Sequence, residues 1–170
     1  GGGHGQANKS YGAALIDDHT PTPEHARFLW SRLAKIVVIG GLLWLLPMML
    51  LATHYGWDHT LTQMGWFFTK AALLTFGGAY AVLPYIYQGA VGFYEWLTPA
   101  QMIDGLALGE ATPGPLIMVV AFVGFTGGYV NALFGPDMLF LAGAVAATLV
   151  VWFTFLPSFI FILYCVGIGK

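Results

Sequence analysis

The chain contains apolar stretches long enough to cross a lipid bilayer, and this feature limits its fold more than any other. A hydrocarbon core of ~30 Å needs about 20 helical residues. Four such stretches follow the first thirty residues, at about 36–52, 64–87, 116–134 and 138–167. Because a spanning segment must satisfy its own backbone hydrogen bonds in lipid, these stretches predict an all-α membrane protein, a polytopic helical bundle.

The composition agrees with a bilayer as the main solvent and excludes other partners. Of the 170 residues, 58% are hydrophobic and 8% are charged, whereas roughly 25% are charged in an ordinary soluble domain. The net charge of −2 comes without a basic patch, so nucleic acid is excluded as a partner. Cys165 is the single cysteine, so a disulfide within the chain and a cysteine-based metal site are excluded as well.

The first thirty residues differ from the rest. They are rich in Gly, Asn, Asp, Thr and Pro and have no apolar periodicity. We predict a disordered tail or linker over residues 1–30 and a helical membrane domain over residues 31–170. Arg27, Arg32 and Lys35 precede the first apolar stretch, which places the tail in the cytoplasm by the positive-inside rule.

Two helix-breaking segments, Thr75–Tyr80 with Gly77-Gly78 and Thr112–Pro115 with Pro113-Gly114, carry most of the functional information. We expect broken or re-entrant helices there, because irregular backbone at membrane depth is tolerated only beside protein or a water-filled cavity. A helix that restarts after a break directs free N–H groups and the positive end of its dipole toward the break, which suits an anion. Secondary transporters use facing broken helices in this way.

Glycine and proline also have structural uses, and these interpretations stay open. Gly77-Gly78 fits close helix packing as well as it fits a binding site. Gly124 and Gly128 are four residues apart and match the small-residue packing motif. Pro47 and Pro157 are interpreted as structural kinks.

Lys70 and Glu110 are the charged residues nearest the two breaks. Lys70 either contacts an anion or extends to the membrane surface as an anchor, since it lies near the start of its apolar stretch. Glu110 is a proton carrier, a helix-end charge or a partner of Lys70. Because a carboxylate repels a dianion, we favour proton coupling or gating for it.

Polar side chains near the breaks were weighed as further candidates. Tyr80 and Gln88 can hydrogen-bond an oxyanion. Four other aromatic residues are predicted to lie at the membrane interface: Tyr85, Tyr87, Tyr94 and Trp96. Asp104 is predicted as a surface charge, and His54 and His59 as solvent-facing loop residues.

Four segments together resemble the chromate ion transporter family in the identity, order and spacing of their residues. They are Thr75–Pro84, Trp96–Thr98, Asp104–Pro115 and Phe122–Phe125. The resemblance covers about residues 67–163 and is greatest to the second half of members built from two homologous halves. It implies a multi-pass protein of the bacterial inner membrane that exports chromate and confers chromate resistance, with sulfate as the competing substrate.

The resemblance also implies that the chain is a fragment of a larger transporter, which needs the missing homologous half or a second copy. The residues that occupy family motif positions are Lys70, Gly77, Gly78, Tyr80, Glu110, Thr112, Pro113 and Gly114. We predict alternating access, with the dianion held by backbone N–H groups at both breaks. Thr75, Thr112 and Lys70 would support it, and Glu110 would move the proton.

Other classes of function stay open. A membrane assembly subunit or an anion channel would share the composition. No set of catalytic residues supports an intramembrane enzyme, because the chain lacks the His-Glu-x-x-His and Gly-x-Ser-x-Gly patterns. We therefore predict no catalytic residue, metal or cofactor.

Overall fold

The computed structural model describes residues 30–76 and 78–168. Within them it has six α-helices, one π-helix and one 3-10 turn, and no strand. The elements are α1 (Trp30–His54), α2 (Thr60–Thr75), α3 (Ala79–Tyr87), η2 (Gln88–Phe93), α4 (Pro99–Glu110), α5 (Pro115–Val130), η3 (Pro136–Met138) and α6 (Leu139–Ile168). The predicted all-α fold is confirmed. The predicted tail lies outside the described residues, except Trp30, the first residue of α1.

Within the described part of the chain, two segments are long and apolar enough to cross a membrane: Trp30–His54 and Pro136–Val166. They confirm the expected stretches at 36–52 and 138–167. The second forms one helix of 30 residues, α6. Pro47 lies inside α1 and Pro157 inside α6, and neither proline ends its helix.

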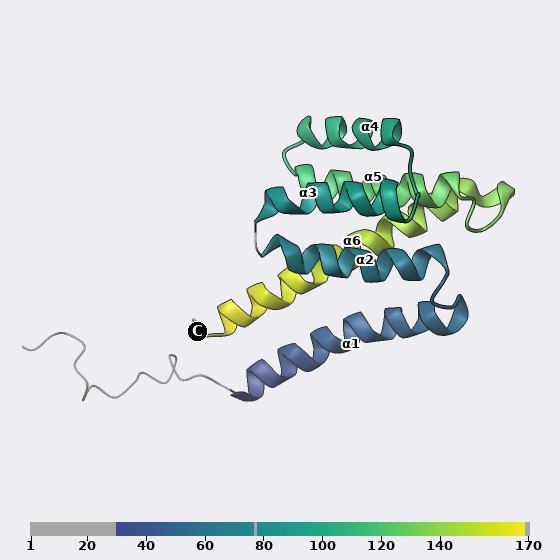
Figure 1. Cartoon of the computed structure of the whole chain (residues 1–170). Helices are drawn as coiled ribbons and strands as arrows, with labels where there is room; N and C mark the ends of the chain where they lie inside the picture. The colour runs from purple at the N-terminus through teal and green to yellow at the C-terminus, as the bar shows by residue number, and fades with distance from the viewer. Residues whose placement is uncertain (1–29, 77, 169–170) are drawn as a thin grey trace, which may run out of the picture.

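The expected stretch at 64–87 is not one continuous span. α2 ends at Thr75, α3 begins at Ala79, and the chain reverses between them to form a hairpin (Figure 1). Gly78, with a φ of 134°, allows the reversal, because this backbone conformation excludes side chains with a Cβ. The predicted break at the glycines is therefore confirmed. Pro84, expected to interrupt the stretch, lies inside α3.

The helices α4 and α5 form a second hairpin. Thr98 and Gln101 make a capping box that starts α4. Met102, Gly105 and Gly109 form the buried side of α4, and a Cβ on Gly105 would lie 2.5 Å from the Phe122 ring of α5. Asp104 is exposed on the other side, as predicted.

Close contact between α5 and α6 forms the centre of the bundle. A Cβ on Gly124 would lie 3.0 Å from the carbonyl oxygen of Ala146, and one on Gly128 would lie 2.6 Å from that of Ala142. The predicted packing role of both glycines is confirmed. In Figure 1 both hairpins turn at the same end of the bundle, and α6 extends beyond both turns.

Candidate functional site

The first break engages its own polar groups. The Thr75 hydroxyl donates to the carbonyl oxygen of Ala72, at 2.6 Å. The Gly78 N–H donates to the carbonyl oxygen of Thr75, at 3.1 Å. Two of the predicted anion donors are therefore occupied by the turn itself. Gly77 and the side chain of Tyr80 lie outside the described part of the chain.

The second break leaves backbone donors free. Pro113 and Pro115 have no N–H, and the Thr112 hydroxyl donates to the carbonyl oxygen of Gly109, at 2.9 Å. No described group accepts from the N–H of Gly114, Leu116 or Ile117 at the start of α5, and no side chain caps this helix. This break fits the expected anion site at a helix N-terminus better than the first one does.

Lys70 and Glu110 lie on different hairpins. Glu110 is the exposed last residue of α4, next to the second break. Lys70 belongs to α2, ten residues after Thr60, or about 15 Å along the helix. Among the described residues no carboxylate forms an ion pair with Lys70, so the alternative that pairs it with Glu110 finds no support.

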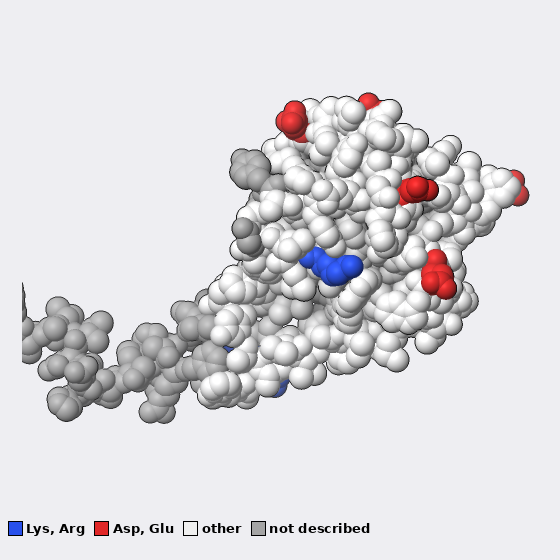
Figure 2. Space-filling view, viewed as in Figure 1, with Lys and Arg blue, Asp and Glu red and all other residues white. Residues whose placement is uncertain are grey.

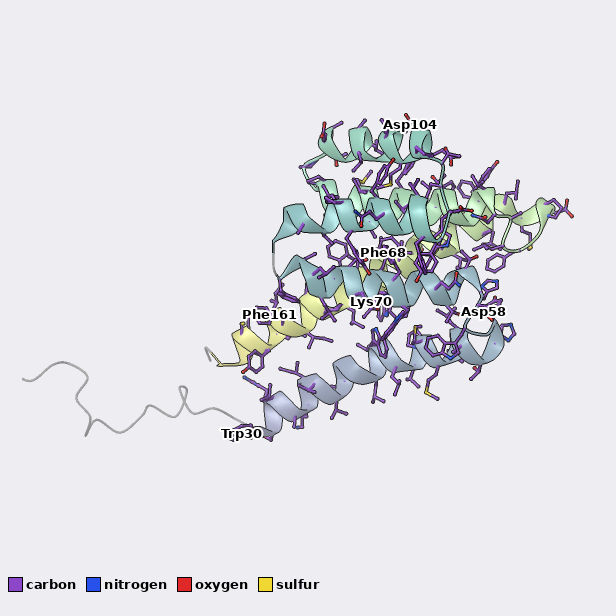
Figure 3. All side chains as sticks on the ribbon, in the orientation of Figure 1. Trp30, Asp58, Phe68, Lys70, Asp104 and Phe161 are labelled. Carbon is purple, nitrogen blue, oxygen red and sulfur yellow. The ribbon has the colours of Figure 1, made fainter. Side chains whose placement is uncertain are left out.

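Lys70 lies ten residues after the start of α2 at Thr60 and five residues before its end at Thr75. It is therefore about 7.5 Å from the nearer end of the helix. Both interpretations of Lys70, an anion contact and an anchor at the membrane surface, stay open. Figure 3 shows Lys70 on α2, well away from the end of the helix at Thr60.

A cavity of about 330 Å³ opens beside Lys70 between α2 and the α3–η2 segment. Its lining residues are Phe67, Lys70, Tyr85, Gln88, Gly89, Phe93 and Tyr94. None of the described residues at the two breaks lines it. The structure therefore separates Lys70 from the breaks that the sequence grouped with it.

Aromatic stacking fixes one wall of this cavity. The Tyr85 ring stacks on Phe67 with centroids 4.8 Å apart, and the Tyr94 ring stacks on Trp96 at 4.5 Å. Trp96 is buried, so its prediction as an interfacial residue is wrong. The spacing of Tyr85 and Gln88, three residues apart, indicates a shared helix face and is the sequence signal that could have identified this wall.

The π-helix brings the wall close to α2. A Cβ on Gly89 would lie 2.2 Å from the Phe67 ring, so only glycine permits this approach. The wider π turn includes Gln88, Gly89 and Phe93, which all line the cavity. Turns of this kind occur frequently at functional sites.

The electrostatic surroundings of Lys70 are simple. Figure 2 shows a large blue patch on α2, with smaller blue areas at the lower edge of the molecule and separate red patches on the same face. The Lys70 Nζ lies 5.9 Å from the centroid of the Trp66 ring, which provides a cation–π contact. Among the described residues no carboxylate lines the cavity, and Lys70 is the charged residue of its lining.

Known proteins similar to this chain are named as transporters. The chain is 47% identical to a chromate transport protein of Pseudomonas aeruginosa over 92 residues, which are 54% of this chain and 18% of that protein. It is 35% identical to a chromate transport protein of Cupriavidus metallidurans over 101 residues, which are 59% of this chain and 22% of that protein. The chain thus spans about a fifth of the length of either relative.

A shorter relative and a family model also match the chain. Over 62 residues the chain is 39% identical to the uncharacterized transporter YwrA of Bacillus subtilis, covering 36% of this chain and 35% of that protein. No solved structure matches the chain. The family model described as Chromate transporter matches residues 62–169, which comprise α2 to α6. With more than half of its length matched in this way, the chain belongs to the chromate transporter family.

Proposed function

We propose that this chain is the part of a secondary transporter that exports chromate across the inner membrane and thereby confers chromate resistance. The family match over residues 62–169 is the observation that supports this proposal most directly. Since the chain spans about a fifth of its chromate transport relatives, the complete pathway requires the homologous half or a second copy. We propose that the transporter is multi-pass and that chromate and sulfate compete.

The proposed mechanism is alternating access around the two hairpin turns. At the second turn, the free N–H groups that begin α5 point their partial positive charge toward a passing dianion. Thr112 and Gly114 belong to this turn, while Pro113 fixes its backbone. At the first turn, Gly77, Gly78, Thr75 and Tyr80 would contribute once its internal hydrogen bonds rearrange.

Glu110 is the proposed proton carrier. It ends α4 and is exposed, only four residues before Gly114. An ionised carboxylate so near the N–H groups of α5 competes with an oxyanion for the same positive potential. Protonation of Glu110 would therefore favour anion entry, and its deprotonation would favour anion release.

The experiment that tests this proposal measures radiolabelled chromate flux into inverted vesicles containing the full-length protein. We expect saturable flux that a pH gradient stimulates and that sulfate inhibits. Glu110→Gln should reduce the flux under a gradient to the level measured without one, because glutamine carries no titratable proton. Asp104→Asn is the matched control, since Asp104 is exposed on the same helix.

The outcomes separate the candidate functions. Gradient stimulation that survives in Glu110→Gln would reject Glu110 as the proton carrier. Flux that does not saturate would indicate an anion channel instead of a transporter. A wild-type protein that neither binds nor moves chromate would favour an assembly subunit.

A further inference from the structure

We propose that the Lys70 cavity is an oxyanion-binding subsite, with Gln88, Tyr85 and Tyr94 as further ligands. This inference rests on the proposed function, since it assigns the substrate of that transporter to specific side chains. It differs from the proposed mechanism in place, because the cavity lies along the arms of the α2–α3 hairpin and no described residue of either turn lines it.

The first argument concerns charge. A lysine in an apolar helix of a membrane protein is unfavourable unless something compensates its charge. Among the described residues no carboxylate pairs with Lys70, and its charged group has only the Trp66 ring as a partner. An anion from solution supplies the missing charge. A lysine with a purely structural role would instead be expected to have a carboxylate partner.

The second argument concerns donors. The Tyr85 and Tyr94 hydroxyls and the Gln88 amide line the same cavity as Lys70, and no described residue hydrogen-bonds these three side chains. Ammonium, amide and phenol groups all donate hydrogen bonds, and the lining has no carboxylate to repel an anion. A cluster of free donors around one cation selects a ligand rich in acceptor oxygens, such as a tetrahedral oxyanion.

The third argument concerns rigidity. Stacking of Tyr85 on Phe67 and of Tyr94 on Trp96 holds both phenols in place before a ligand arrives. The contact between Gly89 and Phe67 sets the distance between the walls. Donors that are fixed in advance lose little entropy on binding.

The volume indicates how selective the cavity is. At about 330 Å³ it has space for on the order of ten water molecules, at ~30 Å³ each. An oxyanion bound there keeps part of its water shell, so most contacts to it are shared with water. We therefore expect the cavity to accept chromate and sulfate with affinities that differ by less than about tenfold, because close steric discrimination needs a tighter fit.

The test is equilibrium binding of radiolabelled chromate, and separately of sulfate, to the purified full-length protein. Lys70→Met should weaken binding about tenfold or more, and Lys70→Arg by less than about threefold, because the charge-assisted hydrogen bonds are lost only in the first variant. Gln88→Leu and Tyr94→Phe should each weaken binding several-fold. Thermal unfolding of each variant verifies that it is folded.

Matched controls are available in the same chain. Lys35→Met removes an exposed lysine from α1, and Tyr129→Phe removes the hydroxyl of an exposed tyrosine from α5. Neither residue lines the Lys70 cavity, and we expect both variants to bind as the wild type does. A loss of binding in Lys35→Met equal to that in Lys70→Met would overturn the inference, since any positive charge would then serve.

The remaining outcomes distinguish this inference from the proposed function. If Thr112→Val weakens binding and Lys70→Met does not, the cavity is not a subsite. The proposed transport function and the proposed anion binding at the turns are then retained. If the wild type transports chromate and the four cavity variants transport at its rate and bind with its affinity, the inference alone fails. A wild type without chromate binding or flux overturns both.

Discussion

At the scale of single residues, small side chains at the α5–α6 contact decide how closely these helices approach. A membrane offers no hydrophobic drive for helix association, so van der Waals packing between closely spaced backbones replaces it. Gly124 and Gly128 face the carbonyl oxygens of Ala146 and Ala142. A side chain there meets rigid backbone, which cannot rotate away as a flexible side chain can.

Gly128→Ala tests this contact. The added Cβ would lie 2.6 Å from the Ala142 carbonyl oxygen, and overpacking of this kind typically costs about 1–3 kcal/mol. We expect the free energy of unfolding in detergent to fall by that amount. Gly41→Ala is the control, because nothing lies within 4 Å of its Cβ position, and alanine favours a helix interior. Equal loss in both variants would show that the contact does not limit stability.

At the scale of the elements, the start of α2 determines where Lys70 lies along that helix. His59 caps α2: its Nδ1 accepts a hydrogen bond from the Leu61 N–H at 3.2 Å, while its ring stacks on Tyr55. His59 lies in the connection between α1 and α2, as predicted, but it is half-buried and not fully exposed to solvent. Histidine is not a typical capping residue, so this role could not be predicted from the sequence.

The stability of this cap should depend on pH. Burial lowers the pKa of His59 from its ordinary value of 6.5, and a proton on Nδ1 would break the bond to Leu61. As pH falls, His59 therefore takes up a proton in the unfolded chain before it does so in the folded protein. The contribution of His59 to the stability of the fold is complete above about pH 6.5, and it is lost as pH falls through the lowered pKa of the folded state.

His59→Asn provides the measurement. Asparagine keeps an acceptor for the Leu61 N–H and has no proton to gain. We expect the wild type to lose thermal stability between about pH 8 and pH 5, and His59→Asn to lose about 0.5–1.5 kcal/mol less over that range. His54→Asn is the control, and it should follow the wild type. An identical pH profile for wild type and His59→Asn would contradict the role of the cap.

At the scale of the whole molecule, α1 is the most loosely attached helix of the bundle. Gly40 and Met48 are its buried residues. Its hydrogen bonds to other helices include one from the Trp44 indole to the Thr69 hydroxyl, at 3.0 Å. Another runs from the Trp152 indole to the Leu43 carbonyl oxygen, at 3.2 Å. The family match starts after α1, at residue 62.

Thr69→Val tests how much the first of these bonds contributes. Valine keeps the shape of threonine and removes the acceptor for the Trp44 indole. Hydrogen bonds between membrane helices contribute about 0.6 kcal/mol on average and about 1.7 at most, so we expect a loss of stability in that range and faster proteolysis of α1. Thr53→Val is the control, since Thr53 is exposed and donates to the Met49 carbonyl of its own helix. Equal proteolysis of α1 in both variants would contradict the contribution of the Trp44 bond.

The sequence by itself determined the class of fold and the places where helices break. Long apolar stretches can be stable in lipid only as helices, and Gly-Gly and Pro-Gly-Pro segments disfavour helical backbone whatever surrounds them. The packing of Gly124 and Gly128 was predictable for a related reason, because a four-residue spacing places both on one helix face.

Only the tertiary structure decided how the broken pieces are arranged. Hydropathy along residues 64–87 is the same whether the chain continues or reverses, so the α2–α3 hairpin depends on the φ of Gly78 and on contacts with α6. The cavity beside Lys70 is likewise invisible in the sequence, because Tyr85, Gln88 and Tyr94 reach it only after that reversal. Neighbouring residues along the chain determine the local backbone conformation, whereas a binding cavity requires side chains that are distant along the chain to meet in space.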